Sequence, residues 1–205
     1  MPRIRIHFSK RGYASFISHM DLPALFSRAA ARAGLRMERT NGFSPHPRLA
    51  LCPPLPVGVE GLSEPADFWF VEWEPGSRDA WNRSLPDGIG ISSAVPVDGV
   101  SLNKLCSAAS YIVTPLGGAS PRDVTGVIET TLRENGALLD VSASGDEVLV
   151  SSSDLERCGP SRMVKDLVSA RLISGWGDLH MVRAAVGRWD PDGMRVIPLT
   201  EECPL

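Results

Sequence analysis

At 205 residues the chain is long enough for one large domain or two small ones, and its 43% hydrophobic and 22% charged residues are typical of a globular protein. No run approaches the roughly 18 apolar residues of a membrane helix, and the N-terminus alternates polar with apolar residues instead of resembling a signal peptide. These features argue against a membrane protein and predict a soluble, cytoplasmic one.

The net charge of −3 hides an uneven distribution along the chain. Residues 1–48 contain nine Lys or Arg against two Asp or Glu, a balance of +7, whereas the other residues contain 12 against 22, a balance of −10. This asymmetry predicts that the N-terminal part faces a polyanion such as RNA. The alternative is that the opposite charges pair within the folded chain.

The four cysteines, Cys52, Cys106, Cys158 and Cys203, are scattered and form no Cys-x-x-Cys pair. Structural zinc sites and iron–sulfur clusters use closely spaced cysteines, so this spacing does not favour either. We therefore expect reduced thiols, no metal and no cofactor.

In chain order, residues 3–8 alternate in the manner of a half-buried strand, which a turn at 10–12 ends. A Ser-x-x-Asp capping pattern at 18–21 and apolar residues at helical spacing predict a helix over 20–33. The Pro-rich stretch 42–56 encloses a short apolar run at 49–52, which is either an edge strand or a loop. Strand 66–73, helix 77–85 and strand 89–97 follow, which gives the order β-α-β-β-α-β.

The second half repeats this order without obvious sequence identity. We predict, in turn, strand 110–116, helix 120–134, strands 138–143 and 147–151, helix 161–172 and strand 180–189. The pattern indicates an α+β protein of two tandem ferredoxin-like units, a basic domain over 1–98 and an acidic domain over 109–205. Gly, Ser and Asn gather between them, at 98–109.

A basic ridge is predicted on the first helix. Arg28 and Arg32 lie four positions apart and so share one helix face, and Arg36 and Arg39 follow Gly34. Such a ridge can follow phosphates, although an ordinary solvated helix face has the same pattern. The residues that we expect to bind RNA or another anion are Lys10, Arg11, Ser18, His19, Arg28, Arg32, Arg36, Arg39, Phe43, Ser44, His46 and Arg48.

Two histidines are candidate catalytic residues. His19 precedes the first helix, where free backbone N–H groups attract an anion, and His46 stands between two prolines that stiffen its loop. If the fold brings them together with Asp21, they form either an acid–base pair for an RNA 2′-hydroxyl or part of a metal site. The alternative is that His19 caps the helix, His46 packs on the prolines and neither does chemistry.

Tyr13 and Phe16 lie beside Lys10 and Arg11 in the sequence. There they either stack on unpaired bases or belong to the core.

Three motifs resemble the radical-SAM-linked family of unknown function: Lys10-x-Gly12-x-x-x-Phe16-Ile17-Ser18-His19-x-Asp21, Gly42-Phe43-Ser44-Pro45-His46-Pro47 and Leu55-Pro56-Val57-Gly58-Val59-Glu60. The resemblance covers residues 1 to about 75 and includes the end of the first helix. It implies a partnership with a cobalamin-binding radical SAM enzyme that acts on RNA or a translation component. It implies no catalytic residue in this chain, which lacks the cysteines of that enzyme's cluster.

The favoured hypothesis is a recognition module that binds RNA or a translation component for such an enzyme. One alternative is a metal-independent endoribonuclease that resembles CRISPR-type RNA-processing enzymes, with His19 or His46 as the base and Arg28 or Lys10 stabilising the phosphorane. Another is a metal or small-molecule binding protein built on His19, Asp21 and His46. All three depend on the basic ridge and the two imidazoles converging on one open face.

Overall fold

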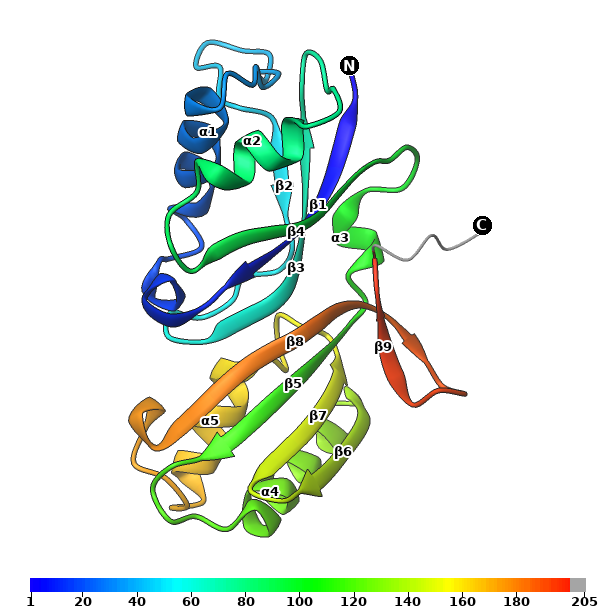
Figure 1. Cartoon of the computed structure of the whole chain (residues 1–205). Helices are drawn as coiled ribbons and strands as arrows, with labels where there is room; N and C mark the ends of the chain where they lie inside the picture. Colours follow the sequence, from blue (N-terminus) through cyan, green and yellow to red (C-terminus); the bar gives the residue numbers. More distant parts are fainter. Residues whose placement is uncertain (200–205) are drawn as a thin grey trace.

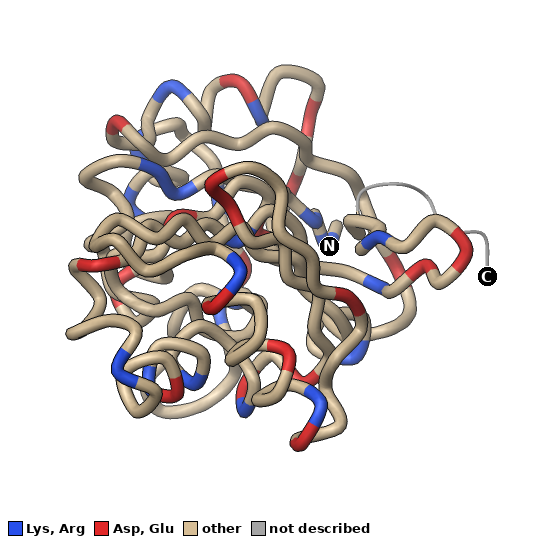
Figure 2. Tube along the Cα trace, turned by 90° about the horizontal axis from the view of Figure 1, so that it is seen from below, with Lys and Arg blue, Asp and Glu red and all other residues tan. Residues whose placement is uncertain are grey.

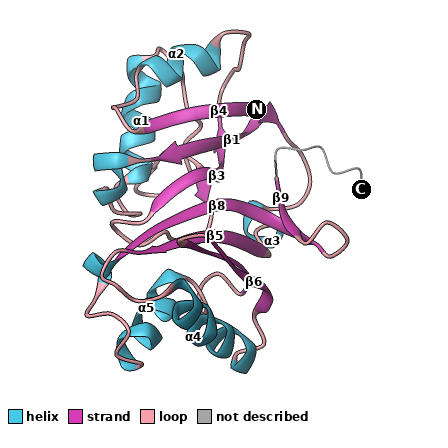
Figure 3. Cartoon of the chain, turned by 60° about the horizontal axis from the view of Figure 1, so that its bottom comes forward, coloured by secondary structure: helices cyan, strands magenta, loops and turns pink. Residues whose placement is uncertain are grey.

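The computed structural model describes residues 1–199, and within them a single mixed sheet of nine strands runs through both halves of the chain (Figure 1). The strands pair in the order β4-β1-β3-β8-β5-β7-β6, with β2 also on β3 and β9 also on β8. Helices α1 and α2 lie against the N-terminal strands, and α4 and α5 lie against the C-terminal ones (Figure 3). The predicted α+β class is confirmed.

The N-terminal half contains β1 (Arg3–Lys10), α1 (Leu22–Arg32), β2 (Leu49–Leu51), β3 (Glu60–Trp69), α2 (Ser77–Arg83) and β4 (Ile89–Pro96). Its strands pair antiparallel. The run at 49–52 is the edge strand β2 rather than a loop. Strand β3 begins six residues before the predicted start at Ala66, because a polar segment pairs with the end of β1 through Lys10 and Gly61.

The C-terminal half contains β5 (Ala108–Pro115), α4 (Pro121–Glu134), β6 (Leu138–Ser144), β7 (Glu147–Ser153), α5 (Pro160–Ser169), β8 (Leu179–Asp190) and β9 (Arg195–Pro198). Ser120 caps α4 by accepting from the backbone N–H of Asp123, as its sequence position predicts. The periodicity did not reveal β9, α3 (Leu102–Leu105) or the 3₁₀ turns η1 (Gly12–Phe16) and η2 (Trp176–Asp178).

Two apolar clusters stabilise the molecule. The first lies under α1 and α2, where Phe26 packs edge-on against Phe8 and Trp81 and lies beside Phe68. The second fills the C-terminal half and also takes in Leu55 and Val59 from the segment before β3. The second cluster therefore binds the two halves to each other.

The halves meet along one edge of β3. Because β2 is short, it covers only the end of that edge, at Ala66–Phe68, and β8 pairs in parallel with the start of β3 at Glu60 and Gly61. The predicted linker carries α3, whose contacts with β2 and β3 bring Cys106 close to Cys52 in the same apolar cluster. None of the helices in residues 1–199 combines the length and the hydropathy that crossing a membrane requires.

Candidate functional site

A buried ion pair marks the junction of the two halves. Arg183 of β8, which is 1% exposed, donates from Nε to Oε1 of Glu64 at 2.9 Å and from Nη2 to Oε2 of the same carboxylate. Nη2 also donates to the Pro53 carbonyl at 2.9 Å. Burial acts against the charge of the guanidinium, but Glu64 outweighs it and raises the pKa of Arg183. The guanidinium is therefore charged, and two hydrogen bonds hold it against the carboxylate.

Lys10 ends β1 beside this pair and is also buried. Its Nζ donates to the carbonyls of Ser15 at 3.0 Å and Ile17 at 3.1 Å, which fixes the backbone of η1 and the turn into α1. Burial lowers the pKa of Lys10, and Arg183 acts in the same direction while Glu64 opposes it. The side chain of Lys10, which the sequence predicts to bind an anion, is thus buried inside the protein.

His19 lies in the turn between η1 and α1, partly covered, with its imidazole facing the same charges. Burial and then the positive charge of Arg183 lower the pKa of His19, so the ring is neutral at pH 7. Ser18 Oγ donates to the Asp21 carboxylate at 2.6 Å, and α1 has no side-chain cap. The predicted capping pattern therefore ties Ser18 to Asp21 instead of to the helix backbone.

Two hollows that share part of their lining lie at this junction. The inner cavity, of about 10 Å³, is lined by Phe8, Lys10, His19, Leu22, Leu51, Cys52, Leu55, Glu64, Pro65 and Arg183. The outer cleft, of about 340 Å³, is lined by His19, Leu51, Cys52, Pro53, Pro54, Asn103, Cys106, Ser107, Asp154, Leu155 and Glu156. His19, Leu51 and Cys52 belong to both linings, so the cleft and the cavity adjoin each other at these residues.

The Cys52 thiol in this wall is protonated. Cys52 and Cys106 are buried and unbridged, and burial, followed by the neighbouring Cys106, raises the pKa of Cys52. Burial also raises the pKa of Cys158. A protonated thiol is a poor nucleophile and a poor metal ligand. Cys203 lies outside the described residues.

Two of the four arginines of the basic ridge, together with Arg48, are engaged within the N-terminal half. Arg32 donates to the Ser84 carbonyl at 2.7 Å, and Arg36 pairs with Glu72 at 2.9 Å. Arg48 pairs with Glu38 at 3.2 Å and lies over the Trp69 ring at 4.5 Å. For Arg28 and Arg39, which are exposed, no ion pair with any of residues 1–199 is found.

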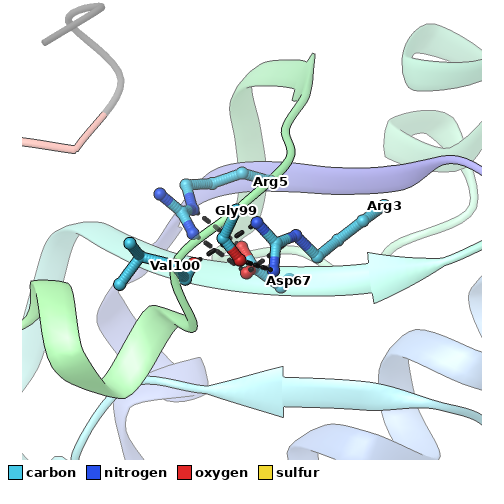
Figure 4. A network of polar contacts seen from close by, with 5 residues as sticks. All are labelled: Arg3, Arg5, Asp67, Gly99 and Val100. Atoms are coloured by element: carbon cyan, nitrogen blue, oxygen red, sulfur yellow. Dashed lines mark hydrogen bonds and ion pairs between the residues drawn. The ribbon is translucent and has the colours of Figure 1, made fainter. Parts of the chain in front are cut away.

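Two further arginines of the basic segment are structural. Arg5 donates to both oxygens of Asp67 at 2.7 and 2.9 Å, and Arg3 joins the same carboxylate at 3.7 Å (Figure 4). Arg3 also donates to the carbonyls of Gly99 and Val100, each at 3.3 Å, which anchors the segment after β4. These two charges are not available to a ligand.

Basic and acidic segments therefore alternate along the folded trace (Figure 2). Residues 1–97 contain 11 Lys or Arg and 9 Asp or Glu, a balance of +2, because β3 and the segments around it are acidic. The +7 of residues 1–48 is thus mostly neutralised within the half that contains it, as the alternative interpretation of the charge pattern held.

His46 does not approach His19. The loop of His46 is closed by a hydrogen bond from the Thr40 N–H to the His46 carbonyl at 2.8 Å and by pairing of Arg39 with Pro47. Strand β2, which follows this loop, begins opposite Phe68 near the start of β1, whereas His19 lies by Lys10 at the end of β1. Figure 1 shows the loop beyond the end of α1 that is farthest from the C-terminal half. The expected convergence is not found, because α1 separates the two histidines.

Several aromatic residues of the N-terminal segment are on the surface. Tyr13 is 96% exposed and Phe16 is 67% exposed, both in η1 before α1, while Phe43 is fully exposed in the loop after α1, next to the exposed Ser44. Arg11, also exposed, adjoins Tyr13. Tyr13 and Phe16 are therefore not core residues.

In residues 1–199, no three His, Cys, Asp or Glu side chains are arranged to hold a metal ion.

The sequence interpretation found His19 and Lys10 but missed Glu64 and Arg183. Arg183 is a lone charge in the apolar run Met181-Val182-Arg183-Ala184, and such a charge needs a buried partner, whereas Glu64 lies in a polar segment that gives no such signal. That signal predicts a partner for Arg183. It does not indicate that the partner is Glu64, 119 positions away.

A comparison with curated proteins found no match. A family model described as "Uncharacterized protein conserved in bacteria (DUF2344)" matches residues 3–152. The match includes His19, Lys10, Glu64 and the whole N-terminal half, and ends before Arg183. Since it spans well over half of the chain, the protein belongs to this family of uncharacterized bacterial proteins.

Proposed function

We propose that the protein is a recognition module that holds unpaired RNA along α1 and presents it to a separate enzyme. The observation that carries the proposal is the exposure of Tyr13 and Phe43, at 96% and 111%, at opposite ends of a helix that also presents Arg28. Bases of unpaired RNA stack on exposed aromatic rings, and arginines bind the phosphates between them. A helix of 11 residues is about 16 Å long, enough for a few nucleotides.

The strand order supports the finer fold assignment in this proposal. Both halves run β-α-β-β-α-β, and their strands lie in the orders β4-β1-β3-β2 and β8-β5-β7-β6. In each, the first and third strands are central and the second and fourth are at the edges, which is the order of a ferredoxin-like unit. We therefore assign the chain as two tandem ferredoxin-like units, a type of fold in which sites grafted on the scaffold decide the function.

The proposed partner is a radical SAM enzyme. This part rests on the resemblance of the segments at 10–21, 42–47 and 55–60 to radical-SAM-linked proteins. The first two flank α1, so they coincide with the exposed aromatic residues of the proposed RNA surface.

The test is fluorescence anisotropy with a labelled single-stranded RNA of about 10 nucleotides. Tyr13→Ala and Phe43→Ala should each weaken binding about 5- to 100-fold, since stacking contributes about 1–3 kcal/mol per base. The matched control is Leu116→Ala, an exposed apolar residue of the C-terminal half. Equal affinity of all four proteins would refute the proposal.

A second candidate function is RNA cleavage with His19 as general base. It is favoured by the neutral imidazole of His19, which lines the same cavity as the cationic Lys10 and Arg183. Cleavage of total RNA in EDTA that is lost in His19→Gln and kept in His46→Ala would support it. Cleavage that survives in His19→Gln would exclude this mechanism.

A further inference from the structure

The inner cavity contains more hydrogen-bond donors than acceptors. An ammonium group has three N–H donors, and Lys10 uses two of them on the carbonyls of Ser15 and Ile17. A guanidinium has five, and Nη1 of Arg183 is buried without a hydrogen-bond partner among residues 1–199. The Tyr111 hydroxyl interacts with the Arg183 side chain, although the contact falls short of full hydrogen-bond geometry. Buried donors of charged groups are costly to leave unpaired, so the cavity suits an acceptor.

The charges of the cavity favour an anionic acceptor. Lys10 and Arg183 carry two positive charges. Glu64 carries one negative charge, and both its oxygens accept hydrogen bonds from Arg183. His19 is neutral at pH 7, and the thiol of Cys52 is protonated, so neither adds a charge to the lining. The balance inside the cavity is therefore positive.

The size of the cavity limits what enters it. Its volume of about 10 Å³ corresponds to roughly one water-sized sphere, which is the space of a single oxygen atom. The outer cleft of about 340 Å³ adjoins it through His19, Leu51 and Cys52 and lies in the size range of small-molecule sites. A ligand therefore fits with one atom inside and the rest outside.

We propose that the junction binds a small molecule bearing a carboxylate or phosphate group, one oxygen of which enters the inner cavity and accepts hydrogen bonds from Lys10 and Arg183. His19 contacts the same group at the mouth of the cavity. The carboxylates of Asp154 and Glu156 line the outer cleft, so the rest of the ligand presents hydrogen-bond donors such as amino or hydroxyl groups. This site is separate from the exposed aromatic residues beside α1 and does not depend on RNA binding there.

The experiment is a proton NMR titration of the His19 imidazole in the full-length protein, first with sodium acetate and then with sodium phosphate, at constant ionic strength. Both probes should shift the His19 signal saturably and raise the pKa of His19, because an anion beside the ring stabilises its protonated form. The exposed imidazole of His46 is the internal control and should not respond. A His19 signal that does not move, or that drifts without saturating in step with His46, would overturn the proposal.

Variants identify the residues that bind the anion. Lys10→Met keeps the length of the side chain and removes the ammonium, and it should weaken acetate binding about tenfold or more. Arg122→Met removes an exposed charge from α4 in the C-terminal half and should leave the acetate affinity unchanged. Equal losses in the two variants would overturn the proposal, and the wild-type titration decides it alone if Lys10→Met does not fold.

A competition experiment separates the two sources of a phosphate group. A single-stranded RNA of about 10 nucleotides is added to the protein saturated with phosphate. If the His19 signal stays at its phosphate-bound position, the site takes a small molecule as proposed. If the RNA displaces the phosphate, the small-molecule assignment is wrong and the group belongs to RNA.

Discussion

Glu64 of β3 and Arg183 of β8 form a two-point ion pair across the junction of the two halves, 119 residues apart in the sequence and almost completely buried. Gly61, three residues before Glu64 on β3, pairs with Arg183 in the only parallel strand pairing found among residues 1–199. One residue pair thus joins the N-terminal and the C-terminal strands of the sheet and lines the inner cavity.

Breaking this ion pair should destabilise the whole protein. Glu64→Gln leaves the buried charge of Arg183 without its counter-ion and should lower the free energy of unfolding by about 3–5 kcal/mol. Urea denaturation measures the change. The control is Glu72→Gln, which breaks the exposed pair with Arg36 and should cost at most about 1 kcal/mol. Similar losses in both variants would mean that the junction does not depend on the pair.

Acid should destabilise the protein through His7. This ring is buried in β1, its Nδ1 lies 2.8 Å from Ser63 Oγ and its Nε2 is unpartnered among residues 1–199. Burial, and then Arg5, lower the pKa of His7 from 6.5 to about 4. The unfolded chain therefore binds this proton at a higher pH than the folded chain, so stability is full above pH 6.5 and falls as the pH drops toward 4.

The expected loss from His7 is about 3 kcal/mol between neutral pH and pH 4. Urea denaturation at a series of pH values measures it. In His7→Gln the pH dependence over this interval should shrink, whereas His180→Gln, which alters an exposed ring, should keep it. An unchanged slope in His7→Gln would contradict the assignment.

The thiols of the outer cleft should react slowly. Because burial raises the pKa of Cys52, little thiolate is present at neutral pH. Alkylation of the native protein with iodoacetamide, followed by mass spectrometry of the separate peptides, should modify Cys52 and Cys106 at least about tenfold more slowly than in the urea-unfolded chain. Rapid modification of Cys52 in the native protein would show that the cleft wall is open.

Secondary structure was predictable where local chemistry decides it. Helix α4 starts where Ser120 caps it and ends at Asn135 and Gly136, as the sequence indicates. The start of β3 was missed because Gly61 and Glu64 lack strand-like periodicity and are ordered by β1 and β8. Tertiary pairing, which no local pattern encodes, sets that boundary.

The candidate site was predictable only in part. His19 and Lys10 are near each other in the sequence and remain so in the fold, which is why motif reasoning found both. Arg183 reaches them through strand pairing between distant segments, and His46 is held away by the length of α1. The charge asymmetry predicted more free positive charge in residues 1–48 than the fold leaves there. Asp67 and Glu72 lie beyond the basic segment in the sequence and pair with its arginines.

The arginines of α1 and its following loop should differ in their contribution to RNA binding. Arg28 has no ion pair among residues 1–199, whereas Arg36 is paired with Glu72. Arg28→Gln should therefore lower the affinity and reduce the slope of log affinity against log salt by about one, and Arg36→Gln should change the slope less. Anisotropy titrations at several salt concentrations give both slopes. A larger effect from Arg36→Gln would contradict the assignment of Arg28 to a phosphate.

The most direct measurement is ultraviolet cross-linking of the protein to single-stranded RNA, with the attached residues located by mass spectrometry. If RNA lies along α1, the cross-links fall on Tyr13, Phe16 and Phe43, at both ends of the helix. Cross-links confined to the C-terminal half, or none at RNA concentrations that saturate binding, would contradict the account.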